Sequence, residues 1–77
     1  MTDNTFNGWA NYSTWNVALY IQNDEGLYEF ARECKNDGYQ YFADVISETG
    51  SQVTPDGVSW THPELDTDEL DEMMAEL

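Results

Sequence analysis

Residues 11–23 read NYSTWNVALYIQN, and the middle of this stretch is apolar on nearly every side. A helix that is apolar all round is typical of a central, buried position. A buried strand is the alternative, because Val17 and Ile21 also favour strands and a short apolar run has no decisive periodicity. Ser13 or Thr14 can cap a helix, and a second helical pattern follows directly. We therefore predict a helix here.

The second helical pattern begins at residues 23–25, where acids in the first turn suit the helix dipole. Arg32 and Lys35 lie in its last turn, where cations are favoured, and Gly38 suits the left-handed residue that ends a helix. One face is apolar at helical spacing and another carries a row of glutamates four residues apart. The apolar face consists of Leu27, Phe30, Ala31 and Cys34, and the row of Glu25, Glu29 and Glu33.

A third helix is predicted from about Tyr39 to Glu48, with Gly50 as its terminator. The segment 52–60 that follows has a Pro-Asp-Gly turn between short apolar positions, with Trp60 as the expected anchor. It predicts a small β-hairpin or, equally, a packed loop, because two strands of about three residues are marginal alone. The inward residues of the third helix are expected to be Phe42, Val45 and Ile46.

The last segment has two successive capping-box patterns, the first at Thr61 and Glu64 and the second at Asp66 and Glu69. An apolar seam then repeats at helical spacing while acids fill the other faces, which predicts an acidic amphipathic helix. The seam consists of Leu70, Met73, Met74 and Leu77, and the acids are Asp68, Glu69, Asp71, Glu72 and Glu76.

These segments predict a mainly α fold, a compact bundle of three to four short helices with one small β-hairpin or packed loop near residues 52–60. No repeat or linker divides the 77 residues, so we expect a single small domain over residues 1–77, loose at 1–11 although Phe6 and Trp9 could fold back on the core. A mean hydropathy of −0.66 with high net charge is typical of disorder. Three Trp, five Tyr and three Phe indicate a folded core instead.

The cysteine content and the absence of a signal-peptide pattern indicate the cellular compartment. Cys34 is the single cysteine, so no internal disulfide can form and a reducing compartment fits. Its position on the apolar face predicts a buried small side chain. No signal-peptide pattern and no apolar run of about 18 residues is present. We expect a soluble, cytoplasmic protein without membrane contact.

The charge narrows the class of partner. Sixteen acidic residues against Arg32 and Lys35 give a net charge of −14, and 11 of the acids follow Lys35. Such a chain repels nucleic acid and anionic membranes and attracts proteins with basic surfaces. A duplex as long as this protein, roughly 30 Å, carries about 17 phosphates. The charge total is therefore compatible with DNA mimicry.

No sequence pattern predicts catalysis or a bound metal. His62 and Cys34 lack the spacing of a zinc site, and Leu70 interrupts the calcium-loop pattern that begins at Asp66. Catalytic triads, phosphate-binding glycine loops and nucleotide motifs are absent from the sequence. We expect no metal, no cofactor and no enzymatic activity.

The candidate protein-binding residues are acids and aromatic side chains. The acids would meet Lys and Arg of a partner, and exposed Tyr side chains are common interface anchors. The candidates are Glu25, Glu29, Glu33, Glu64, Asp66, Asp68, Glu69, Asp71, Glu72, Glu76, Tyr20 and Tyr41.

Residues 11–23 and the later stretches 54–60, 63–66 and 69–73 resemble small bacteriophage-encoded acidic proteins of unknown function with an NYxTWNVALxIxN motif. The motif itself is interpreted as a helix start and packing element. The resemblance implies expression in an infected cell and so a location in the host cytoplasm. Small acidic phage proteins are often similar in role to DNA mimics that occupy the nucleic-acid site of a host protein.

The leading hypothesis is a phage effector that binds and inhibits a basic, nucleic-acid-binding host protein of transcription, nucleoid structure, restriction or repair. It would not bind nucleic acid itself. The alternative is a protein-interaction adaptor, or a small virion or assembly protein, that uses the apolar C-terminal seam. That seam would pair with a partner helix or with a second copy of the chain.

Overall fold

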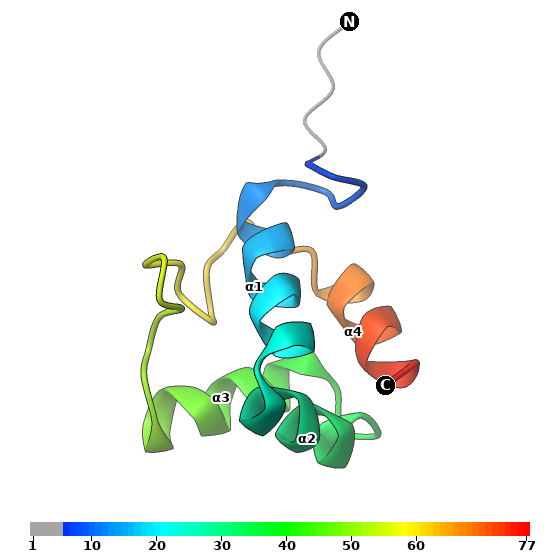
Figure 1. The fold of residues 1–77 in the computed structure, drawn as a ribbon, viewed down its shortest axis with the longest axis vertical. Coiled ribbons are helices and arrows are strands. Elements are labelled where there is room, and N and C mark those ends of the chain that lie inside the picture. The colour runs from blue at the N-terminus through cyan, green and yellow to red at the C-terminus, as the bar shows by residue number, and fades with distance from the viewer. Residues whose placement is uncertain (1–5) are drawn as a thin grey trace, which may run out of the picture.

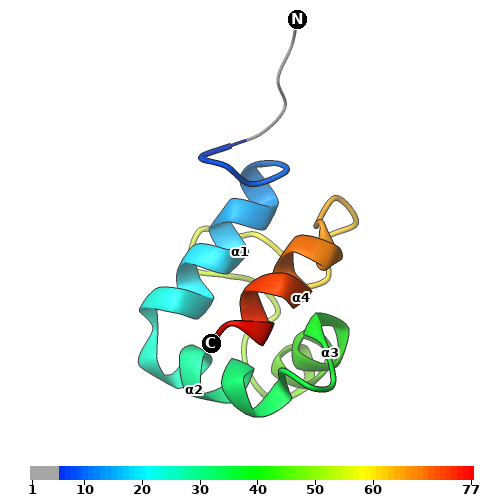
Figure 2. The same ribbon diagram turned by 90° about the vertical axis from the view of Figure 1, so that its right-hand side faces the viewer.

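The computed structural model describes residues 6–77 and contains four helices there, with α1 standing beside α4 and α2 and α3 lying across their lower ends (Figures 1 and 2). The connection from residue 50 to 66 returns along the side of α1 that faces away from α4 (Figure 1). This mainly α bundle confirms the predicted fold class. The helices are α1 (Tyr12–Asn23), α2 (Glu25–Cys34), α3 (Tyr39–Thr49) and α4 (Thr67–Ala75).

Helix α1 begins one turn earlier than its predicted caps. Asn11 is the N-cap, and its side-chain oxygen accepts the backbone N–H of Thr14 at 2.8 Å. The prediction of Ser13 or Thr14 as the cap is wrong, because both lie inside the helix and Thr14 is fully buried. The choice of helix over strand is confirmed.

The ends of α2 follow the sequence signals closely. Asp24 caps its start by accepting the N–H of Leu27 at 3.0 Å. Gly38 has a φ of +92° and donates its N–H to the Cys34 carbonyl at 3.0 Å, as a left-handed helix terminator does. Helix α3 follows at once and reaches its C-cap at Gly50.

The 50–66 connection is a series of turns with no strand pair. Val53 and Ser59 form an isolated antiparallel bridge around Gly57, so the packed-loop alternative describes it better than a hairpin. No helix starts at the first predicted capping box, since Glu64 donates its N–H to His62 Nδ1 at 3.0 Å within a turn. At the second predicted capping box, Asp66 is the N-cap of α4 as predicted, because its side chain accepts the N–H of Glu69 at 3.1 Å.

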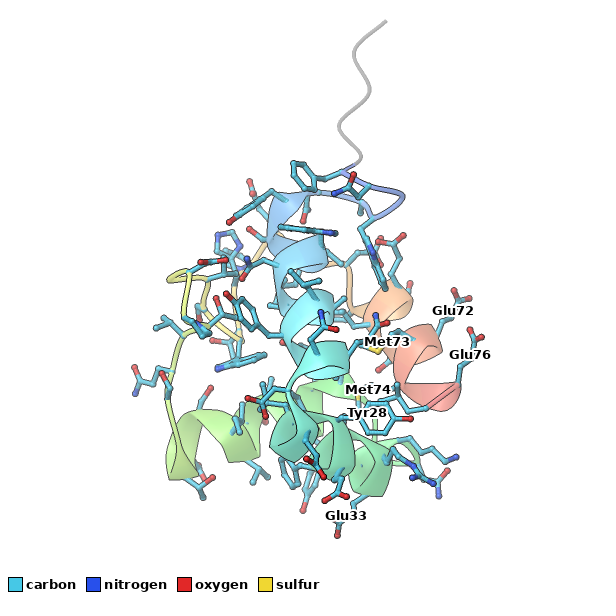
Figure 3. All side chains as sticks on the ribbon, viewed as in Figure 1. Tyr28, Glu33, Glu72, Met73, Met74 and Glu76 are labelled. Carbon is cyan, nitrogen blue, oxygen red and sulfur yellow. The ribbon has the colours of Figure 1, made fainter. Side chains whose placement is uncertain are left out.

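The core lies where the four helices and residues 58–60 of the connection meet. Tyr39 crosses it and donates its hydroxyl to the Trp60 carbonyl at 2.6 Å. The apolar seam of α4 is part of this core, and Figure 3 shows Met73 and Met74 pointing inward from α4. The largest buried side chains include Tyr39, Phe42, Ile21, Leu70, Met74 and Val17, while Val45 and Ile46 are only partly buried.

The segment before α1 is attached to the body over the residues that the structure describes. Phe6 and Trp9 exchange two backbone hydrogen bonds of 2.7 and 2.8 Å, and Trp9 packs on the core. Ala10 donates its N–H to Glu69 Oε1 at 2.7 Å. Residues 6–11 are therefore not loose, and Trp9 folds back on the core as the alternative for this segment allowed. Residues 1–5 lie outside the described part.

Candidate functional site

Three of the acids predicted to bind a partner form hydrogen bonds within the fold. Asp66 caps α4, and Glu69 accepts the N–H of Ala10 as described above. Asp71 Oδ1 accepts the backbone N–H of Tyr39 at 2.6 Å, at the start of α3. These carboxylates already accept backbone donors, so their first role is structural.

The remaining acids of α4 form an exposed row. Asp68, Glu72 and Glu76 are all exposed and follow one another at four-residue spacing, which places neighbours about 6 Å apart along the helix axis. In Figure 3, Glu72 and Glu76 project outward from the side of α4 opposite Met73 and Met74. We call Asp68, Glu72 and Glu76 the α4 acid row. It gives a partner three carboxylates on one rigid element.

The glutamates of α2 are exposed but point in another direction. Glu33 projects downward from α2 in Figure 3, whereas Glu72 and Glu76 project sideways from α4. Glu29 and Glu33 also share a shallow hollow with Arg32 and Lys35, the two basic residues of the chain. The local negative charge is therefore weaker there than on α4. Glu25, Glu29 and Glu33 are all exposed, as is Glu64 in the turn before α4.

The two predicted tyrosine anchors differ in exposure. Tyr41 is half exposed, as predicted. Tyr20 is partly buried against the core, so it is less exposed than predicted. Desolvation, and then the nearby Asp56 carboxylate, raise the pKa of Tyr20 above its usual value. The Tyr20 hydroxyl therefore lies near Asp56 of the 53–59 turn.

An aromatic cluster at the start of α1 was missed by the sequence analysis. Phe6 and Tyr12 are 38% and 45% exposed, and their rings meet edge to face with centroids 5.4 Å apart. Trp15 lies 4.8 Å from the Phe6 ring and 5.6 Å from the Tyr12 ring. We call these three residues the aromatic patch. Its one sequence signal is the i, i+3 spacing of Tyr12 and Trp15, which places both on one helix face.

The polar residues of the 11–16 stretch join α1 to two distant loops. Asn11 donates to the Glu64 carbonyl at 2.6 Å, and Thr14 Oγ1 accepts the N–H of Asp66 at 3.0 Å. Buried Asn16 donates to Asp56 Oδ2 at 2.8 Å and accepts the Thr54 hydroxyl at 2.7 Å. The interpretation of the motif as a helix start and packing element agrees with these contacts.

An apolar groove of about 550 Å³ lies between α2, α3 and the 51–60 segment. Phe30, Ile46 and Trp60 contribute to its walls, and the buried indole N–H of Trp60 has no hydrogen-bond partner among the described residues.

No three His, Cys, Asp or Glu side chains within residues 6–77 converge as metal ligands. None of the described helices is both long and apolar enough to cross a membrane.

Cys34 is buried, as its place on the apolar face predicted. Burial, followed by the nearby Asp37 and Glu33 carboxylates, raises the pKa of the Cys34 thiol. The protonated thiol is therefore favoured, and Cys34 acts as a small apolar residue of the core.

Comparison with known proteins gives one match. A protein-family model described as a family of unknown function (DUF7249) matches residues 2–77. The chain belongs to this family. No curated protein and no solved structure matches it. The DUF7249 match covers both the aromatic patch and the α4 acid row, so the elements of the candidate surface lie within the family's span.

Proposed function

We propose that this DUF7249 protein is a non-enzymatic, bacteriophage-encoded effector that acts in the host cytoplasm. It binds and inhibits a basic, nucleic-acid-binding host protein. The α4 acid row is the observation that carries the proposal. It presents three exposed carboxylates on a helix whose apolar side is already buried, in a chain with a net charge of −14.

The physical basis of the proposal is electrostatic steering. A highly negative protein raises the encounter rate with a positive surface, and this gain falls steeply with ionic strength. The α4 acid row extends over about 12 Å of helix axis. Its spacing of about 6 Å along the helix axis is close to the rise of two phosphates of one strand, about 6.8 Å, along the duplex axis. These dimensions support mimicry of a short stretch of one strand.

The experiment compares two variants that remove equal charge from different helices. D68N/E72Q/E76Q neutralises the α4 acid row, and E25Q/E29Q/E33Q neutralises the α2 glutamates. Each protein is immobilised, exposed to bacterial lysate and eluted in salt steps with or without competing DNA, and the eluted proteins are identified by mass spectrometry. We expect the wild type and the α2 variant to retain a DNA-binding protein that DNA and moderate salt release.

The α4 variant should lose that protein. Equal losses in both variants would mean that total charge, not the α4 acid row, determines binding. A retained partner that resists high salt and ignores DNA would overturn the proposed function.

The adaptor and assembly alternatives relied on the C-terminal seam. Leu70 and Met74 are fully buried and Met73 is 9% exposed, so a partner helix could reach them only if α4 left the core. We therefore propose no second function based on this seam.

A further inference from the structure

The aromatic patch is an exposed surface whose rings are already ordered. Phe6, Tyr12 and Trp15 contact one another through the three ring pairs described above. The Phe6 backbone is fixed by its two hydrogen bonds to Trp9, and Tyr12 and Trp15 lie in the first turns of α1. A partner that binds these rings therefore has little side-chain entropy to remove, which favours affinity.

Two carboxylate residues, Asp56 and Glu64, lie near Tyr12 of the aromatic patch. The Asn16 amide nitrogen lies 3.4 Å from the Tyr12 hydroxyl and 2.8 Å from Asp56 Oδ2, so it joins this ring to a carboxylate. Glu64 and Tyr12 line one hollow of about 620 Å³ together with Asn11 and Ser13. A π face next to carboxylates is the environment that a planar cation prefers.

We propose that the aromatic patch, with Glu64 and Asp56 beside it, binds an arginine side chain of the basic partner. This inference rests on the proposed function and adds the contact that fixes the partner's orientation. A guanidinium can stack on Tyr12 while its N–H groups pair with Glu64, whereas a lysine ammonium cannot stack in the same way. A second copy of this chain is a poor occupant, because it brings another 14 net negative charges.

The test uses two blocked peptides of equal length and charge, one alternating Arg with Gly and the other Lys with Gly. Dissociation constants are measured by calorimetry at low salt, and Trp fluorescence reports contact with the patch. We expect the wild type to bind the Arg peptide about fivefold more tightly than the Lys peptide. Y12A and Y12L, the latter of which keeps an apolar side chain, should remove this preference.

Y41A is the matched control, because Tyr41 is an exposed tyrosine on α3 outside the aromatic patch. Y41A should keep the fivefold ratio of dissociation constants. D68N/E72Q/E76Q should weaken the binding of both peptides by the same factor and so keep the same ratio. A wild-type ratio near one, or a ratio that survives in both Tyr12 variants, would overturn the arginine site. If the α4 acid row still governs absolute affinity in that case, the proposed function stands without this site.

Discussion

Asn16 shows how a single buried amide determines the course of a distant loop. Its side chain is fully buried and contacts Tyr12, Thr54 and Asp56, and the Thr54 hydroxyl in turn accepts the N–H of Val58 at 3.2 Å. A buried amide without partners would be strongly destabilising. The Asn16 side chain is therefore stable in the core only while the 53–59 turn holds Thr54 and Asp56 against it. Sequence patterns predicted the helix around Asn16, but its partners lie about 40 residues away and no local pattern identifies them.

Replacing Asn16 should destabilise the fold strongly. N16A removes two good hydrogen bonds and leaves Thr54 and Asp56 without their partner, so we expect a loss of about 2–4 kcal/mol in the free energy of unfolding. Urea denaturation followed by Trp fluorescence measures it. Q22A, at an exposed position of the same helix, should change stability by less than about 0.5 kcal/mol. An equal effect of both variants would contradict the role given to Asn16.

Tyr39 gives the fold a specific dependence on alkaline pH. Burial raises the pKa of Tyr39 well above its usual value of about 10. Above pH 10 the unfolded chain therefore loses this proton while the folded chain keeps it, so stability falls as pH rises. The contribution of one such group is about 1.4 kcal/mol per pH unit.

Unfolding by urea between pH 9 and 11.5 tests this dependence. Y39F should be less stable than the wild type near pH 8 by about 1 kcal/mol, because the hydrogen bond to the Trp60 carbonyl is lost. It should then lose less stability than the wild type as the pH rises. Y41F controls for loss of a hydroxyl at an exposed ring. Parallel curves for Y39F and the wild type would contradict the assignment.

At the scale of the elements, α3 is capped by a residue of another helix. Its own N-cap, Gly38, has no side chain to offer, and the Tyr39 N–H is instead accepted by Asp71 from α4. Helix boundaries in α2, α3 and α4 were predictable because terminators and caps are local signals. The contribution of Asp71 was not, because it acts across 32 residues of sequence and looks like any other acid of an amphipathic helix.

Neighbouring acids of α4 should therefore behave differently on substitution. D71A should destabilise the protein by about 1 kcal/mol, the usual effect of removing an N-cap side chain. E72A, at the next position and in the α4 acid row, is equally exposed but does not remove the bond to Tyr39, so it should leave stability within about 0.5 kcal/mol of the wild type. Thermal and urea unfolding measure both variants. If E72A is as destabilising as D71A, the distinction between the acids that accept backbone N–H groups and those of the α4 acid row is wrong.

At the scale of the whole molecule, composition predicts the total charge but not how the charged side chains are distributed over the surface. The net charge and the helical class follow from residue counts and spacing. Which acids accept backbone N–H groups depends on tertiary contacts, and the same holds for the exposure of Tyr12 rather than Tyr20. The Cα radius of gyration is 11.7 Å, so most pairs of acids among residues 6–77 lie closer together than the Debye length of about 30 Å at 10 mM salt.

Mutual repulsion among these acids should make the fold more stable when salt is added. Two like charges 10 Å apart in water repel by roughly 0.4 kcal/mol, and the native state holds many such pairs closer together than the unfolded chain does. Raising NaCl from 10 to 100 mM shortens the Debye length from about 30 to about 10 Å, and should raise the free energy of unfolding by about 1 kcal/mol. Urea unfolding at each concentration measures it.

The variant D68N/E72Q/E76Q separates repulsion from other effects of salt. It should be more stable than the wild type at 10 mM NaCl and gain less on salt addition, because three of the repelling charges are gone while the structural acids Asp66, Glu69 and Asp71 remain. A wild type that loses stability as NaCl is added would show that attractive contacts of carboxylates outweigh repulsion. The negative surface would then add to the stability of the fold. Stability alone would explain the presence of the α4 acid row, without a binding partner.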